Sequence, residues 1–403
     1  MVLPPGACGD FRPSVTLRQK RQALCYAVEG LNSFGTVLFF NYLYFLLHDQ
    51  FGYRDKSNLV VAALLGLCYA LASWPAGRLA QRWGYFTALK LGFSIMIVGL
   101  LAGAQLDFAT GKIIAAAVVT LGMSFTWPVL EALVSESETP DRVPHALGIY
   151  NITWAATNAA ALFIGGTLVV KLGYQSLFYV PAILFACQFA LTLWLQRLPK
   201  PDLAEIQSAM PAVDSRLTPK LAKSFQRMAW LANPFAYIAI NTLLAVLPGI
   251  AAKFHLSPMF AGFACSLWCF VRFLSFVFFW QWSGWHYRFR WLVTAFVALV
   301  VSFTIILVAP SLMVVLAAQF LFGAAIGLIY YSSLFYAMDA SDTKSEHGGI
   351  HEAAIGVGNS VGPAVGAAAI WLAPQNASIG AWAVSGLLTA GLGGLVWLRT
   401  RQP

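Results

Sequence analysis

The chain alternates long apolar stretches with short polar gaps, and this alternation predicts its fold. Each stretch holds roughly 20 or more residues, enough for a helix to cross a bilayer. None shows the two-residue alternation of a half-buried strand. We therefore predict an all-α membrane protein whose stretches cross as helices, since lipid offers no partner to an open strand. The twelve stretches cover residues 22–47, 57–77, 85–105, 111–135, 145–170, 175–196, 228–252, 257–282, 290–309, 312–338, 349–372 and 378–398.

A polar region at 197–227 divides the twelve stretches into six and six. It combines charged residues with Pro199, Pro201 and Pro211, a composition typical of a linker. The expected organisation has a cytoplasmic N-terminal tail, a six-helix bundle, a cytoplasmic linker, a second six-helix bundle and a C-terminal tail. Their expected bounds are 1–21, 22–196, 197–227, 228–398 and 399–403.

Composition agrees with a membrane protein. Apolar residues make up 59% of the chain and charged residues 10%, against about 25% charged in soluble domains. The formal charge of +9 does not indicate nucleic acid, because the basic residues lie in the gaps between apolar stretches and form no basic face. The expected surroundings are a lipid bilayer, without a nucleic-acid partner.

The basic residues also predict an orientation. Lys and Arg gather in the gaps on the side of the N-terminus, which places both termini in the cytoplasm. No apolar h-region of a signal peptide precedes the first stretch. The cysteines lie mostly in apolar stretches and give no disulfide framework. Short outer loops fit a multi-pass protein of a bacterial inner membrane.

The gap between the second and third stretches carries a recognisable motif, GRLAQRWGY. It is similar to the G-x-L-A-D-R-x-G-R loop of the major facilitator superfamily. Gln81 and Tyr85 depart from that pattern, which puts the family's charged latch at this loop in doubt. The equivalent gap of the second half, Ser283–Trp291, is also basic. The matching residues are Gly77, Leu79, Ala80, Arg82 and Gly84.

The resemblance implies a rocker-switch carrier. Helices 1, 4, 7 and 10 would line a central cavity, helices 2, 5, 8 and 11 would form the moving interface, and the others would face lipid. The phosphate-binding pattern G-x-x-x-x-G-K-[ST] is absent from the sequence. A gradient of a proton or another coupling ion would therefore drive transport, without a cofactor.

The stretch Gly358–Gly362 matches the G-x-S-x-G elbow of hydrolases, but that elbow needs a strand before the serine. Ser360 instead lies within an apolar stretch, so we expect no enzyme. Gly358, Gly362 and Gly366 recur every four residues, and such small residues allow close helix packing in membranes. Pro363 can bend this helix. We interpret it as a hinge helix at the interface between the bundles.

Polar residues inside the apolar stretches are candidates for function. Arg272 would hold an anionic group of the substrate; alternatively, it forms a structural pair with Asp339 or Glu352. Amides and polar aromatic residues would contact the rest of the substrate, although each amide could equally join two helices. These further candidates for substrate binding are Asn241, Asn32, Asn158, Tyr330, Tyr331 and Trp127.

Four titratable residues are candidates for proton coupling: Glu29, Glu131, His351 and Glu352. Glu29 could instead be a partly hydrated acid, and Glu131 could pair with Arg142 or Arg82. Glu352 could simply stabilise a helix N-terminus. A metal site built on His347 and His351 lacks a convincing third ligand, so no metal is expected.

Together these features predict a secondary active transporter that moves a small organic solute, coupled to protons and acting as a monomer. An anionic group on the solute is a refinement that rests on Arg272. The alternatives are an exporter or flippase of amphipathic drugs or lipids, and a membrane sensor that binds a ligand without moving it.

Overall fold

The structure is a computed structural model that describes residues 17–136, 138, 142–199, 219–339, 344–376 and 378–401. All regular structure within these residues is helical. Twelve of the described spans are long and apolar enough to cross a membrane. The prediction of an all-α protein with twelve transmembrane helices is therefore confirmed.

The first half contributes seven helices. They are α1 (Leu17–Phe51), α2 (Asp55–Trp83), α3 (Tyr85–Gln105), α4 (Ala109–Ser124), α5 (Trp127–Glu136), α6 (Val143–Leu172) and α7 (Ser176–Arg197). The second half contributes seven more. They are α9 (Pro219–Lys253), α10 (Pro258–Cys265), α11 (Leu267–Gln281), α12 (Phe289–Val308), α13 (Leu312–Asp339), α14 (Lys344–Leu372) and α15 (Ile379–Thr400).

The fourth and eighth spans are each made of two helices. The fourth breaks between α4 and α5, just before Pro128, because proline has no N–H to donate and crowds the carbonyl four residues earlier. The eighth breaks at Ser266, between α10 and α11. The N–H of Trp268 donates across to the side chain of Gln319, 3.3 Å away, which anchors the start of α11.

Two helices begin before the apolar stretches from which they were predicted. Helix α1 already begins at Leu17 and α9 at Pro219, and each is 35 residues long. Hydropathy marks only the part of a helix that lies in lipid, whereas both helices start with polar turns. Residues 200–218 of the linker lie outside the described part.

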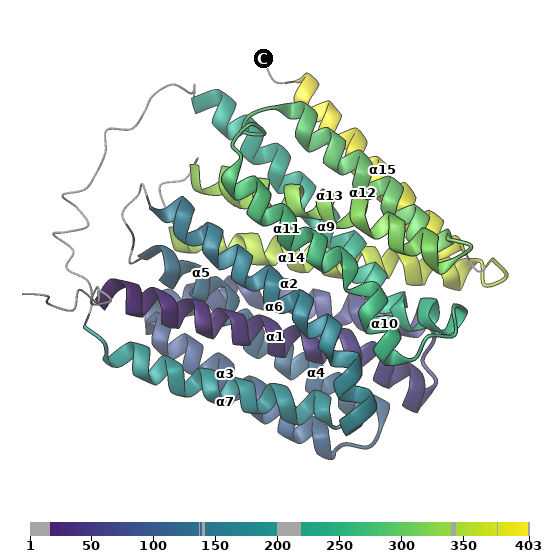
Figure 1. Cartoon of the computed structure of the whole chain (residues 1–403), viewed down its shortest axis with the longest axis horizontal. Coiled ribbons are helices and arrows are strands. Elements are labelled where there is room, and N and C mark those ends of the chain that lie inside the picture. Colours follow the sequence, from purple (N-terminus) through teal and green to yellow (C-terminus); the bar gives the residue numbers. More distant parts are fainter. Residues whose placement is uncertain are drawn as a thin grey trace, which may run out of the picture.

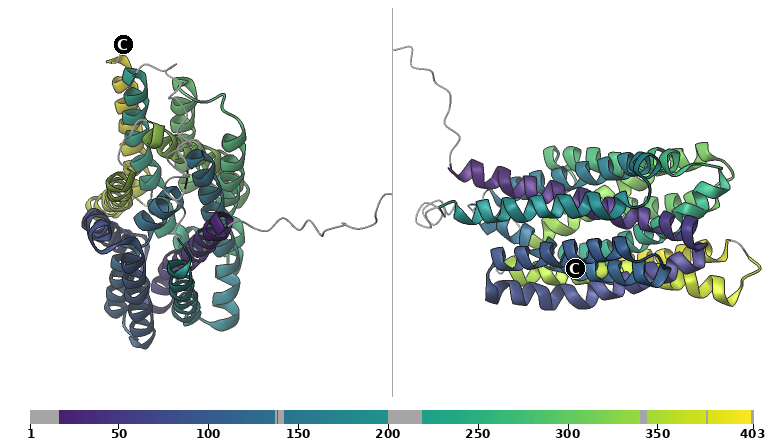
Figure 2. Two further views of the ribbon diagram at one scale, coloured as in Figure 1. Left: turned by 90° about the vertical axis from the view of Figure 1, so that its left-hand side faces the viewer. Right: turned by 90° about the horizontal axis from the view of Figure 1, so that it is seen from below.

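The two halves lie side by side (Figure 1). Helices α1 and α9 begin, and α7 and α15 end, on one side of the molecule, which we call the terminal end; the opposite side is the distal end. Helix α14 packs on α2 of the other half, and α6 packs on α10 and α11. The views in Figure 2 show the same two bundles from the side and from below.

Ring contacts follow the α6 interface along its length. His145 meets Trp280 near the terminal end, with ring centroids 5.1 Å apart. Trp154 stacks on Phe276 at the middle, at 5.9 Å. Phe163 lies 4.6 Å from Phe263 near the distal end. The halves are thus in contact towards both ends of α6.

The interface between α2 and α14 depends on glycine residues that let the two helices approach closely. Gly66 of α2 lies so close to the backbone of Asn359 and Ser360 in α14 that a β-carbon would overlap it, and Gly356 meets Ala70 in the same way. Ser360 lies in the middle of the continuous helix α14, so the hydrolase-like motif has no strand beside it.

Two of the three glycines at four-residue spacing pack within their own half. Gly358 lies against Pro234 and Gly362 against Ile238, and both of these partners belong to α9 of the same half. The close approach that the two glycines allow is therefore inside one bundle, while Gly366 lies near Leu59 of α2. Helix α14 passes through Pro363 without a break.

Large apolar side chains cover the outside of the molecule. Leu71 is 68% exposed and Ile183 is 62% exposed, and they have many neighbours of the same kind. So much exposed apolar surface is typical of contact with lipid or another protein. Together with the twelve apolar helices, it makes this an integral multi-pass membrane protein.

Candidate functional site

A central cavity of about 170 Å³ lies between the two halves. Helices from both halves line it, and its wall is mostly apolar and rich in aromatic rings, with a few amides and charges. Its polar or aromatic lining residues include Thr36, Phe40, Asn41, Tyr44, Tyr69, Trp127, Trp154, Asn158, Tyr237, Asn241, Trp268, Arg272, Tyr330, Glu352 and Asn359.

The positive charge of the cavity comes from Arg272 of α11, which is only 2% exposed. Its guanidinium carbon lies 4.4 Å from the ring centroid of Trp154 and 4.9 Å from that of Trp268. Indole faces are the best π partners of a cation. The Nε and Nη2 atoms have no hydrogen-bond partner among the described residues. We call Arg272 with its two tryptophans the basic centre.

Amides from several helices surround the basic centre. Asn241 of α9 donates a hydrogen bond to the side-chain oxygen of Asn359 on α14. Asn158 of α6 lies beside Cys269, one turn before Arg272 on α11. Asn41 also lines the cavity. An amide wall can donate and accept hydrogen bonds at the same time, which suits an oxygen-rich solute.

The aromatic candidates separate into two groups. Tyr330 stacks on Trp154, with ring centroids 5.0 Å apart, and Trp127 meets Trp154 edge-on at 6.2 Å. Both line the cavity. Tyr331 instead packs against Phe276 and Trp285, outside the lining.

Asn32 is also absent from the cavity lining. It is fully buried in α1, and neither of its amide atoms has a partner in the described part.

A second group of charges lies between the halves. We call Glu29, Glu131, Glu352 and His351 the buried-acid group. Glu29 of α1 has no exposed surface, and Ser33 donates to its Oε1 atom over 2.8 Å. Its other oxygen has no partner among the described residues.

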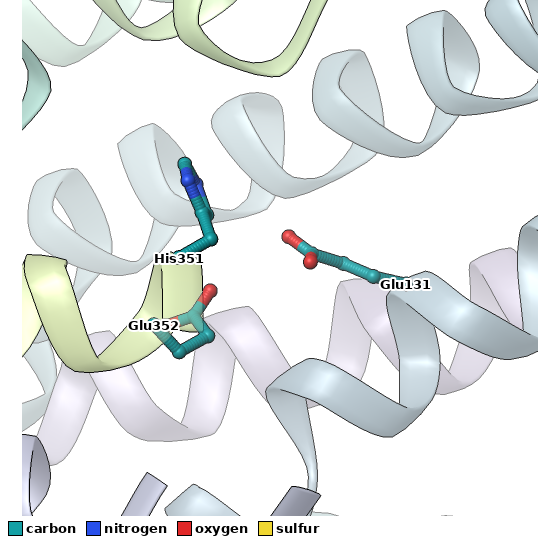
Figure 3. Close-up of side chains that lie close together, drawn as sticks. All are labelled: Glu131, His351 and Glu352. Atoms are coloured by element: carbon teal, nitrogen blue, oxygen red, sulfur yellow. The ribbon is translucent and has the colours of Figure 1, made fainter. Parts of the chain in front are cut away.

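The other three members come together from two helices. Figure 3 shows the Glu131 side chain of α5 reaching towards His351 and Glu352 of α14. One ligand atom of each lies within 4.8 Å of the others, and each residue is at least nine-tenths buried. Tyr69 of α2 donates to Glu352 over 2.6 Å.

The alternative roles considered for these residues do not match the geometry. Helix α14 begins at Lys344, so Glu352 lies about two turns inside it, beyond the first turn where a helix terminus acts. The described residues form no ion pair between Glu131 and Arg82 or Arg142, or between Arg272 and Glu352. The side chains of Asp339 and His347 lie outside the described part.

The motif residues lie at the terminal end. Gly77 is buried within α2, and Arg82 is exposed near its end. Gly84 joins α2 directly to α3 with a φ of 86°, a conformation that favours glycine. This conformation explains the glycine, while Arg82 does not line the cavity.

Sequence reasoning missed the neutral partners of the charges. Trp268 and Ser33 could have been identified from the sequence. Trp268 precedes Arg272 by one helical turn, and Ser33 follows Glu29 by one turn. Trp154 and Tyr69 could not be identified in this way, because they reach Arg272 and Glu352 from distant parts of the chain. Tyr69 and Glu352 are 283 residues apart.

Comparisons with known proteins agree with this architecture. The family model of the Major Facilitator Superfamily matches residues 23–363. The inner membrane transport protein YajR of Escherichia coli (strain K12) is 26% identical over 136 residues, which are 34% of this chain and 30% of that protein. The human organic anion transporter MFSD10 (TETRAN) has the same fold, with a TM-score of 0.70 at 13% identity. That match covers 94% of this chain and 99% of the neighbour.

Proposed function

Because the chain belongs to the major facilitator superfamily, whose members move solutes across membranes, we propose that it is a secondary active transporter of a small organic anion. The observation that carries this proposal is the basic centre. A guanidinium lies at the wall of the central cavity between two indole rings, and no carboxylate of the described chain pairs with it.

The chemistry of the cavity favours a carboxylate or phosphate as the anionic group. A guanidinium presents several N–H donors in a planar fork that matches two oxygens at once. Two nitrogens of Arg272 have no partner among the described residues, and a buried unpaired charge is costly. A bound anionic group would give these nitrogens hydrogen-bond partners and would neutralise the charge. The structural neighbour described as an organic anion transporter supports the same class.

The size of the cavity limits the solute. Its 170 Å³ is below the roughly 300–1,000 Å³ of pockets for drug-sized ligands. The amides would bind oxygens or hydroxyls of the solute, while the rings of Trp127 and Tyr330 would cover its apolar part. The cavity is complete within one chain, which supports a monomer as the transport unit.

We assign coupling to Glu29. It is fully buried in α1 without a basic partner in the described part, so an ionised carboxylate there would be costly. Proton uptake removes that cost. Glu29→Gln should therefore abolish uphill accumulation while sparing exchange of solute down its gradient. Equal accumulation by the variant and the wild type would remove Glu29 from this role.

The first experiment is a thermal-shift screen of the purified protein against anionic, cationic, neutral and lipid-like compounds. A compound that binds the folded state raises the melting temperature. We expect anionic compounds to stabilise the wild type and not Arg272→Gln, with partial rescue in Arg272→Lys. Anionic compounds that stabilise wild type and Arg272→Gln equally would contradict the proposal.

A second candidate function is export of amphipathic compounds, which the aromatic wall of the cavity favours. It predicts that amphipathic cations or lipids stabilise the wild type and Arg272→Gln to the same extent. A third, a sensor, predicts binding without movement of the ligand into sealed vesicles. Uptake by reconstituted vesicles separates the sensor from both kinds of transporter.

We also propose that both termini face the cytoplasm, in a bacterial inner membrane. The two ends of the described chain lie on the same side of the molecule, as an even number of crossings requires. Reporter enzymes fused to the C-terminus test the side: one that works only in the cytoplasm should be active, and one that works only outside should not.

A further inference from the structure

We propose that Glu131, His351 and Glu352 form a binding site for a divalent transition-metal ion that joins the two halves of the protein. Glu131 comes from α5 in the first half, and the other two come from α14 in the second (Figure 3). Their donor atoms lie within 4.8 Å of one another. Ligands held at about 2.0–2.2 Å from one ion are roughly 3–4 Å apart, so small side-chain rotations complete the site.

Unsatisfied donor atoms support the site independently of this clustering. The Nε2 atom of His351 and the Oε1 atom of Glu131 have no hydrogen-bond partner in the described part, and both residues are only 8% exposed. Buried polar atoms without partners are uncommon because each costs stability. A metal ion bound by these two residues would satisfy buried donor atoms of this kind.

The charge balance points to a cation. Two carboxylates meet here, and the described chain forms no ion pair between either of them and lysine or arginine. Tyr69 is a neutral donor, and of these two carboxylates it donates a hydrogen bond only to that of Glu352. A divalent cation would neutralise both carboxylates. Tyr69 would then hold one ligand in place, as outer hydrogen bonds commonly do around metals.

The donor types select the class of metal. An imidazole nitrogen suits Zn²⁺, Fe²⁺ or Ni²⁺, whereas Mg²⁺ and Ca²⁺ prefer sites made of oxygen alone. The three donors include no thiolate, which argues against a site for Cu⁺. Three protein ligands also leave one position of a tetrahedral ion open to water or to a solute. The site therefore fits Zn²⁺ or a similar first-row ion.

The site is accessible and would affect movement. Glu352 lines the central cavity, so an ion can arrive by the route that a solute takes. A bound ion would tie α5 to α14, and alternating access must separate such contacts between the halves. Bound metal would therefore stabilise the present arrangement and slow the transport cycle. This inference does not depend on the solute proposed above.

The test measures binding directly, with Zn²⁺ as the probe and protein purified through a tag without histidine. Equilibrium dialysis should give one ion per chain for the wild type. His351→Gln and Glu131→Gln should each weaken binding at least tenfold. His255→Asn is the matched control, because His255 is exposed in the loop after α9, and it should bind as the wild type does. Unchanged affinity in both ligand variants would overturn the proposal.

X-ray absorption of the zinc-loaded wild type covers the case in which the variants do not fold. We expect nitrogen and oxygen neighbours, including the scattering of one imidazole. Sulfur neighbours would assign the ion to cysteines and overturn the site. Zn²⁺ should also raise the melting temperature of the wild type. Failure of these binding measurements leaves the thermal-shift response to organic anions unaffected, so the two proposals can fail separately.

Discussion

The basic centre and the buried-acid group are both charged and both buried between the same two halves, yet their surroundings differ in kind. Arg272 lies between the faces of two indole rings, while Glu29 and Glu352 accept hydrogen bonds from hydroxyl groups. Among the described residues, no ion pair joins the basic centre to the buried-acid group. A cation kept apart from nearby acids remains free for an anion, and the acids remain free for a proton or a metal.

The difference also shows how each charge is tolerated in the membrane. An aromatic ring stabilises a cation through its electron-rich face without forming a hydrogen bond. A carboxyl group needs a donor, and a hydroxyl supplies it whether the acid is neutral or ionised. The basic centre is thus stabilised without using its N–H groups, whereas the acids use part of their hydrogen-bonding capacity.

The largest expected effect comes from giving the basic centre an internal anion. Asn158→Asp places a carboxylate on the cavity wall beside α11. This carboxylate would compete with an anionic solute for Arg272. Binding of anionic compounds should fall about 100-fold, which corresponds to roughly 2.7 kcal/mol, as measured by calorimetric titration. Asn158→Leu, which removes the amide without adding charge, should lose much less. Anion binding by Asn158→Asp at wild-type strength would show that Arg272 is not the anchor.

A smaller effect is expected from removing one ring of the basic centre. Trp154→Leu keeps an apolar side chain but loses the cation–π contact, which is worth about 2 kcal/mol at a desolvated site. The measurement is reversible unfolding in mixed micelles. Trp382→Leu is the control, because Trp382 is 53% exposed on the outer surface, and it should change stability little. Equal losses in the two variants would argue against stabilisation of Arg272 by the ring.

The smallest expected effect tests whether the carboxyl group of Glu29 is neutral or ionised. Ser33→Ala removes the hydrogen bond to Glu29. The loss should be about 1 kcal/mol if the carboxyl is neutral and nearer 2–3 kcal/mol if it is ionised. We expect the smaller value. Ser73→Ala is a matched control, since Ser73 is equally buried and donates to the backbone oxygen of Tyr69. A loss well above that of the control would show an ionised Glu29.

Much of the fold could be predicted because lipid imposes a local rule. A helix that crosses a bilayer is predominantly apolar over the part that lies in lipid, so each span can be recognised from its own residues. The breaks at Pro128 and Ser266 were harder to predict. Proline is tolerated inside other spans, such as α2 at Pro75, and the break at Ser266 depends on Gln319 from another helix.

The candidate site could be predicted only in part. Depth in an apolar stretch is visible in the sequence, and it identified Arg272 and Glu29. The choice between a paired and an unpaired Arg272 was not visible, because it depends on which helices of the two halves meet. The same holds for Gly358, whose spacing predicts a packing face but does not say whether α9 or α2 covers it.

The length of α1 and α9 has a practical consequence. At 35 residues each, they measure about 52 Å, against about 30 Å of hydrocarbon. Part of the excess falls at the terminal end, where their first turns are polar, and Arg18 of α1 pairs there with Glu138. The first turns of α1 and α9 should therefore project from the lipid surface as rigid helical extensions. They offer an antibody fragment a rigid epitope, which small membrane proteins without soluble domains otherwise lack as an alignment marker in electron microscopy.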